Sequence, residues 1–226
     1  MMASGDSCDA SEGPRRAESG YATQGFLPPE IVGERACIIS TGRKPGHSPL
    51  TGRAPRAWVF AQWVLEIFGE KLLLSGDVLD VAAGSGALAE KLQRLCSRKL
   101  LCTLVEPEPP ERKSSETGLA WLEEHFNSRS FPCKHRELLL GCSVLLGFHP
   151  DEATEAIIDV SLRLKKPFAV VPCCVHTTLS SEQLLRKTGT TVKTYEEFLL
   201  HLQTKSSLIQ TALLPCDGRN IVLYVL

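Results

Sequence analysis

The chain has 226 residues, with 25 lysines and arginines against 26 aspartates and glutamates, a net charge of −1 and a pI near 6.6. This length suits one α/β domain with a full hydrophobic core. The charge balance gives no sign of a polyanion partner, although a locally basic groove would not change these sums. No apolar run approaches the ~20 residues of a transmembrane helix, so we expect no membrane-spanning segment.

Nine cysteines are scattered along the chain without paired C-x-x-C spacing, and several lie inside apolar runs. The N-terminus has no secretory apolar region, and acidic residues near it are unlike a transit peptide. We therefore expect a reduced intracellular protein with buried thiols. The expected location is the cytoplasm, with the nucleus as the alternative.

The first segment, residues 1–25, is rich in Ser, Gly, Ala and charged residues, and we predict a disordered tail. Residues 26–54 form a predicted N-terminal extension with one candidate strand at 36–39 and a basic loop rich in Gly and Pro. The basic residues near its end either contact an anionic substrate or form a solvated linker. They are Arg43, Lys44, His47, Arg53 and Arg56. Residues 55–226 form the predicted main domain, and Pro55 suits the start of a helix over 57–69.

A strand, a turn of small residues and a helix follow one another from residue 78 to residue 92. An apolar strand at 78–81 contains Asp80, and helical spacing resumes at Leu88 and Leu92. The turn between them consists of Ala82, Ala83, Gly84, Ser85 and Gly86. Glycines allow the sharp bend and the close approach of a ligand or a neighbouring strand. The amides at the start of the helix suit the polar part of a nucleotide-like ligand.

The next apolar run, residues 99–106, ends at Glu106, twenty residues after Gly86. In doubly wound sheets, an acidic residue at about this distance ends the second strand and accepts hydrogen bonds from ribose hydroxyls. Glu106 is therefore the predicted ribose ligand, with Glu108 as the alternative.

The second half of the chain continues the alternation of helices and strands. We predict a helix at 116–126, a weakly marked strand at 131–135 and Glu137 as the nearest candidate for a contact with adenine. An apolar strand at 142–148, a helix at 153–165 and a strand at 168–174 form a right-handed crossover. Helices at 180–187 and 195–204 follow. Apolar runs at 209–214 and 220–226, joined through Asp-Gly, predict an antiparallel hairpin.

The segment VLDVAAGSGALAEKL resembles motif I of the class I S-adenosylmethionine-dependent methyltransferases, with Ala82 in place of the first glycine. The resemblance implies an α/β, Rossmann-like fold over residues 55–226, with a seven-stranded, mostly parallel sheet that ends in an antiparallel hairpin. It also implies S-adenosylmethionine as cofactor. The expected cofactor-binding residues are Asp80, Ala82, Ala83, Gly84, Ser85, Gly86, Glu106 and His149.

A second resemblance concerns GFHPDEATE at 147–155 and FAVVPCCVH at 168–176. These segments are similar to a methyltransferase group that includes tRNA acceptor-stem 2′-O-ribose methyltransferases. His149, Thr154, Cys173, Cys174 and His176 fall where that pattern places them, whereas Pro150-Asp151 departs from it. The resemblance implies an RNA acceptor, tRNA first, and a role in RNA modification. An added RNA-binding subunit would supply the substrate capture that a compact domain lacks.

The expected catalytic residues, His149, Asp151, Cys173 and Cys174, follow two strands whose carboxyl ends meet at one edge of the sheet. His149 is either a base or a helix-start residue, and Asp151 either orients the substrate or caps the helix. The two cysteines act either as a covalent nucleophile or as buried thiols, and their spacing indicates no metal site.

Two other functions stay open. One is a protein or small-molecule methyltransferase, and the other is a catalytically silent methyltransferase-like binding module.

Overall fold

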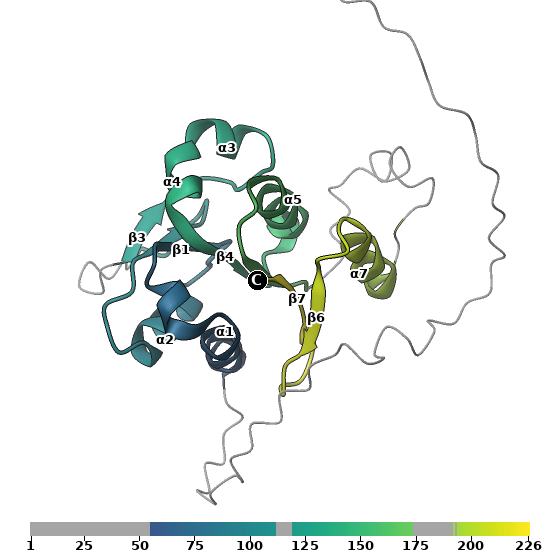
Figure 1. Cartoon of the computed structure of the whole chain (residues 1–226), viewed down its shortest axis with the longest axis horizontal. Coiled ribbons are helices and arrows are strands. Elements are labelled where there is room, and N and C mark those ends of the chain that lie inside the picture. Colours follow the sequence, from purple (N-terminus) through teal and green to yellow (C-terminus); the bar gives the residue numbers. More distant parts are fainter. Residues whose placement is uncertain (1–54, 112–118, 174–191, 193) are drawn as a thin grey trace, which may run out of the picture. The chain divides into compact units, whose positions relative to one another are not determined.

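The computed structural model describes residues 55–111, 119–173, 192 and 194–226. These residues form a seven-stranded sheet in the order β3-β2-β1-β4-β5-β7-β6 (Figure 1). The strands are β1 (Asp77–Val81), β2 (Cys102–Val105), β3 (Leu119–Leu122), β4 (Cys142–Phe148), β5 (Phe168–Val171), β6 (Gln210–Leu213) and β7 (Ile221–Val225). The predicted Rossmann-like architecture is thereby confirmed.

Strand direction changes only at the C-terminal end of the sheet. The strands β1 to β5 pair in parallel, whereas β7 pairs antiparallel with both β5 and β6. β1 lies between β2 and β4, so the strand order reverses beside β1. In open α/β sheets, ligands bind outside the carboxyl ends of the strands at such a reversal.

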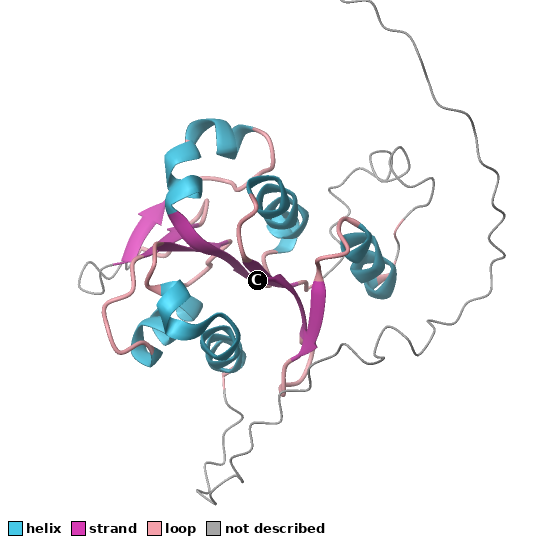
Figure 2. Ribbon diagram, viewed as in Figure 1, coloured by secondary structure: helices cyan, strands magenta, loops and turns pink. Residues whose placement is uncertain are grey.

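Helices cover both faces of the sheet (Figure 2). On one face, α1 (Arg56–Leu73) and α2 (Ala87–Leu95) pack over the strands. The other face carries α3 (Ser130–Lys134), α4 (Arg136–Gly141), α5 (Thr154–Leu164), which follows the short helix η2 (Asp151–Ala153), and α7 (Tyr195–Thr204). The hydrophobic core has two clusters, one on each face of the sheet, and side chains of β4 contribute to them alternately. Val144 and Leu146 belong to the cluster under α1 and α2, and Leu145 belongs to the cluster on the other face. Such a strand, apolar on both faces, is typical of a covered parallel sheet.

Most of the predicted elements are present with small differences in their ends. The strand at 142–148 and the helix at 195–204 have the predicted bounds. The first helix continues beyond residue 69 to Leu73, with a break at Gly69, whose φ is 72°. Because glycine adopts positive φ without a Cβ clash, the chain can turn there and continue as helix.

The region between β2 and β4 was predicted wrongly. Residues 119–122 form strand β3, paired in parallel with β2, instead of the expected helix at 116–126. β3 is an edge strand and only half-buried, so its pattern is weak, and Leu119 and Leu122 also fit helical spacing. The expected strand at 131–135 is instead helix α3, which begins after a turn in which Asn127 Oδ1 accepts the Ser130 amide at 2.7 Å.

Several predictions fall outside the described residues. These are the tail, the extension with its strand at 36–39 and basic loop, the helix at 180–187, and both Cys174 and His176. The division of the chain into a tail, an extension and a domain over 55–226 stays a prediction. Among the helices that the structure describes, none is both long and apolar enough to cross a membrane.

Candidate functional site

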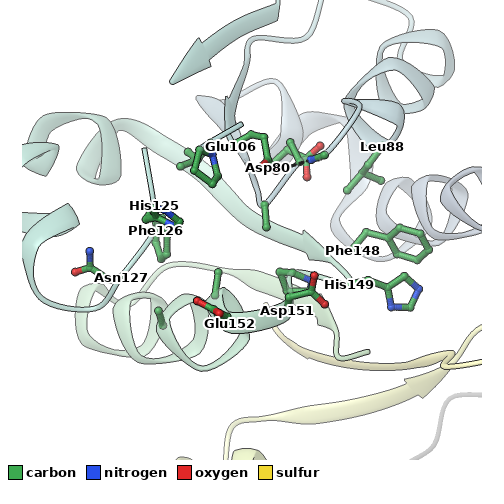
Figure 3. A pocket seen from close by; sticks show the side chains of 18 of the residues that line it. Asp80, Leu88, Glu106, His125, Phe126, Asn127, Phe148, His149, Asp151 and Glu152 are labelled. Atoms are coloured by element: carbon green, nitrogen blue, oxygen red, sulfur yellow. Dashed lines mark hydrogen bonds between the residues drawn. The ribbon is translucent and has the colours of Figure 1, made fainter. Parts of the chain in front are cut away.

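A cavity of about 1390 Å³ opens at the carboxyl ends of β1, β2 and β4, where the strand order reverses. Figure 3 shows its side chains in three groups: Asp80 with Glu106, the segment after β3, and the segment after β4. The predicted residues that line it are Asp80, Ala82, Ala83, Gly84, Ser85, Glu106, His149 and Asp151. The sequence therefore identified two of the three walls.

The turn after β1 adopts left-handed backbone conformations at Ala82 (φ 53°), Gly84 (φ 53°) and Gly86 (φ 77°). A Cβ on Gly84 would meet no atom within 4 Å, so this glycine leaves open space beside the cavity that it lines. A Cβ on Gly86 would lie 2.8 Å from Leu104 Cδ2, and Gly86 is not among the cavity residues. Gly84 thus serves access to the cavity, and Gly86 serves packing of the turn against β2.

Asp80 is a buried acid at the base of the cavity, with 2% of its surface exposed. Burial raises the pKa of its carboxyl to about 7, the Ala89 amide lowers it and the nearby Glu106 charge raises it. Its Oδ2 atom has no hydrogen-bond partner. Because an unpaired buried carboxylate is costly, this position favours a ligand that brings a positive or donating group.

Glu106 directly follows β2, and its carboxylate lies against the glycine turn. Its Oε2 accepts the Gly84 amide at 2.8 Å, and its Oε1 accepts the Glu108 amide at 3.3 Å. The half-buried carboxylate lines the cavity beside Asp80 (Figure 3), whereas the alternative ligand, Glu108, is exposed and lies outside the lining. This geometry favours Glu106 over Glu108 for hydroxyl recognition.

The third wall was missed by the sequence reasoning. Residues 125–129 follow β3 and line the cavity, and they include Phe126 and Asn127. Glu137 lies instead on α4, exposed and 3.9 Å from Arg136, outside the cavity lining. This error has one cause. Because residues 116–126 were predicted to be helical, the end of strand β3, from which this wall extends, was not recognised. The turn residues Asn127 and Ser130 were the available signal of a loop.

The segment after β4 holds His149 (φ 58°) and Asp151 (φ 43°) in the left-handed region. Two non-glycine residues in this region within three positions indicate local strain at the cavity. Packing restrains the segment, because a Cβ on Gly147 would lie 2.8 Å from Pro150 Cγ. The His149 amide also donates to the carbonyl of Val171 at 3.0 Å, which ties the end of β4 to β5.

His149 is neutral in this arrangement. Burial and then the positive charge of Arg56 lower its pKa to about 4, against a smaller opposite effect of Asp151. The Arg56 guanidinium contacts Nε2, and because a guanidinium only donates, Nε2 accepts and the proton of the neutral ring resides on Nδ1. The base role expected for His149 would need Arg56 to leave Nε2.

Asp151 does not cap a helix with its side chain, so that alternative was wrong. No side-chain cap bond is present at η2 or α5, and the Asp151 carbonyl accepts Thr154 Oγ1 at 2.9 Å. Its carboxylate oxygen Oδ1 instead accepts a hydrogen bond from Cys173 Sγ at 2.6 Å. Cys173 therefore lies directly behind a cavity residue without lining the cavity itself. In the described part of the chain, no group of three or more His, Cys, Asp or Glu residues is arranged to hold a metal ion.

No protein-family model matches the sequence, and no curated protein matches it. Among solved structures, the chain is similar to Aeropyrum pernix fibrillarin with natively bound S-adenosyl-L-methionine, at 13% identity over 80% of this chain and 85% of that one, with a TM-score of 0.49. It is also similar to a SAM-dependent methyltransferase from Aquifex aeolicus, at 16% identity over 73% and 87%, with a TM-score of 0.43. The strand order of this chain defines its fold.

Proposed function

We propose that this chain is an S-adenosylmethionine-dependent methyltransferase. The observation that supports the proposal most is the pair of acids at the strand reversal: the buried Asp80 with its unpartnered Oδ2, and Glu106 held against the turn that carries Gly84. A cavity with these two acids in its wall suits a small cationic nucleoside. The strand order and the C-terminal antiparallel hairpin agree with the resemblance to class I methyltransferases.

The residues present fit the parts of S-adenosylmethionine. Asp80 would bind the positively charged methionine end, Glu106 the ribose hydroxyls, and Phe126 would offer apolar surface to the adenine. Gly84 would leave room for the ligand next to the turn. When bound, the cofactor supplies a methyl group on an activated sulfonium, so the protein mainly aligns the acceptor and accepts a proton where the acceptor carries one.

On the acceptor side, Asp151 is the proposed group that takes the proton. Its carboxylate lines the cavity, and Oδ1 accepts a hydrogen bond from the Cys173 thiol at 2.6 Å. Neutral His149 would position Arg56 and the segment after β4 rather than contact the acceptor, because Arg56 engages Nε2 and Nδ1 is buried with no hydrogen-bond partner among the described residues. Cys174, the fourth residue expected for catalysis, lies outside the described part of the chain.

The proposed acceptor is RNA, with tRNA first, modified in the cytoplasm or the nucleus and captured with the help of a partner subunit. Support comes from the resemblance of the segments 147–155 and 168–176, and from the exposed arginines Arg56 and Arg219 near the end of β4.

The deciding experiment has two parts. Calorimetric titration with S-adenosylmethionine should show binding by the wild-type protein and much weaker binding by Asp80→Asn. Transfer of labelled methyl groups should then mark the RNA fraction of cells that lack the protein. Binding without transfer would favour the silent module, and label in the protein or small-molecule fraction would favour the other enzyme class. No binding at all would overturn the proposal.

A further inference from the structure

Two arginines from distant parts of the chain meet next to the strained segment after β4. Arg56 begins α1, and Arg219 lies in the turn between β6 and β7. The Arg56 guanidinium donates from Nη2 to the carbonyl of Arg219 at 3.1 Å and also contacts His149 Nε2. Gly218, next to Arg219 in this turn, has a φ of 86°, a backbone conformation that favours glycine. The hairpin turn and the start of α1 are thus joined at the rim of the cavity.

The Arg219 side chain has a rigid support. Its Cζ lies 3.8 Å from the centroid of the Tyr195 ring, in stacking distance. Tyr195 is 7% exposed, and its hydroxyl donates to the Pro172 carbonyl at 3.3 Å, just after β5. A guanidinium stacked on a fixed ring directs its in-plane N–H donors outward, away from the ring. Arg219 is exposed, so these donors face solvent.

Neither arginine forms an ion pair with a carboxylate in the described part of the chain. Asp151 and Glu152, which follow β4, line the cavity. An oxyanion would therefore be repelled from the cavity and attracted to the rim. Guanidinium forks bind phosphate and carboxylate with paired charge-assisted hydrogen bonds, so two held arginines that form no ion pair in the described part of the chain are suited to such a group.

We propose that Arg56 and Arg219 bind a phosphate of the acceptor RNA, next to the nucleotide that enters the cavity. This inference rests on the proposed function and explains how the proposed active site would select RNA. A polynucleotide carries a phosphate beside every nucleotide, so each nucleotide presented at Asp151 has a phosphate available for the adjoining rim. A peptide acceptor would supply an anion there only when its sequence happened to place an acid at the right distance.

The test uses the full chain without cofactor and a fluorescent oligouridylate titrated at several salt concentrations. Arg219→Gln is the main variant, because Arg219 contacts none of the proposed catalytic residues, and Arg56→Gln is the second. Each should weaken binding about tenfold and reduce the salt slope by about 0.7, the value for one phosphate contact on a single strand. Arg219→Lys should keep the slope while losing part of the affinity, because it keeps the charge and loses the fork.

The matched control is Arg94→Gln, an exposed arginine in the last turn of α2, which removes the same charge elsewhere and should leave affinity and slope unchanged. Wild-type affinity in Arg219→Gln, or no binding of oligouridylate by the wild-type protein, would overturn the inference. Equal binding of polyglutamate through the same arginines would overturn the assignment to phosphate. Titration of every variant with S-adenosylmethionine separates the two proposals. If the wild-type protein binds the cofactor but the arginine variants bind oligouridylate normally, only the inference fails. If the arginine variants weaken oligouridylate binding but the wild-type protein binds no cofactor, only the proposed function fails.

Discussion

Asp80 shows how one residue connects the energetics of the fold with the proposed ligand. Its carboxyl is buried at the end of β1, where burial raises its pKa from 3.8 to about 7 and Oδ2 has no partner. The folded protein therefore holds a proton that the unfolded chain releases at lower pH. This contribution to stability is complete below about pH 4 and is lost as the pH rises through about 7.

Asp80→Asn is expected to stabilise the protein without cofactor at about pH 8 and to leave its stability unchanged at about pH 4. The difference corresponds to at most about 4 kcal/mol of unfolding free energy. Denaturant unfolding of both proteins across this range measures it. A difference that stays constant with pH would contradict the assignment of the raised pKa to Asp80.

The two glycines of the turn should respond in opposite ways. Gly86→Ala is expected to cost about 1–3 kcal/mol of stability, because its Cβ would overlap Leu104. Gly84→Ala should cost only the penalty of a positive φ, about 1 kcal/mol of stability. It should nevertheless weaken the binding of S-adenosylmethionine, because the alanine side chain would enter the open space beside the cavity. Thermal unfolding and calorimetric titration of both variants check this. Unchanged affinity for S-adenosylmethionine in Gly84→Ala would show that the cofactor does not bind beside this turn.

His149 is expected to remain neutral over the pH range in which most histidines titrate, because burial and Arg56 lower its pKa to about 4. NMR of the imidazole should show the Nδ1-protonated form and no titration between about pH 8 and pH 5. Arg56→Gln should move the midpoint toward the ordinary value of about 6.5. A midpoint near that value in the wild-type protein would restore His149 as the candidate base.

At the scale of elements, an ionic network joins α5 to α7. Lys205 Nζ lies 2.6 Å from both Glu155 Oε1 and Asp159 Oδ1, and His201 Nε2 lies 3.1 Å from Glu155 Oε1. Burial alone would raise the pKa of Glu155, but the hydrogen bonds from His201 and Lys205 outweigh it and lower the pKa to about 2. Stability from Glu155 is therefore present above about pH 4.5 and is lost as the pH falls toward 2.

Lys205→Met should destabilise the protein by about 3–5 kcal/mol, because it removes the cationic partner of the buried Glu155 and leaves that carboxylate with His201 alone. Adding Glu155→Gln to that variant should recover most of the loss, since the pair is then removed together. Chemical denaturation of the two single variants and the double variant measures the coupling. Additive losses would mean that the network does not join the two helices energetically.

For the whole molecule, the composition of residues 1–54 predicts a tail and an extension that precede the main domain. A protein that starts at residue 55 is therefore expected to unfold in one cooperative transition, with the stability of the full chain, and to bind S-adenosylmethionine with unchanged affinity. Calorimetry on both lengths provides the comparison. A lower melting temperature of the shorter protein would place part of the fold in residues 1–54.

The local sequence was sufficient for β1, the glycine turn, Glu106 and the crossover from β4 to β5, because buried parallel strands and glycine turns leave strong patterns in consecutive residues. It was insufficient for β3, whose four residues are held by hydrogen bonds to β2 and whose half-exposed side chains have no clear alternation. The third cavity wall was missed for the same reason.

The order of the main elements and the positions of Asp80 and Glu106 could be predicted from consecutive residues, since both depend on neighbours in the chain. What the side chains do depends on the folded sheet. Arg56 and Arg219, 163 residues apart, meet because β7 pairs with β5 and returns the hairpin turn to the start of α1. The protonation of His149 and the partner of Asp151 were decided in the same way, because charge, burial and hydrogen bonding depend on residues that only the folded sheet brings together.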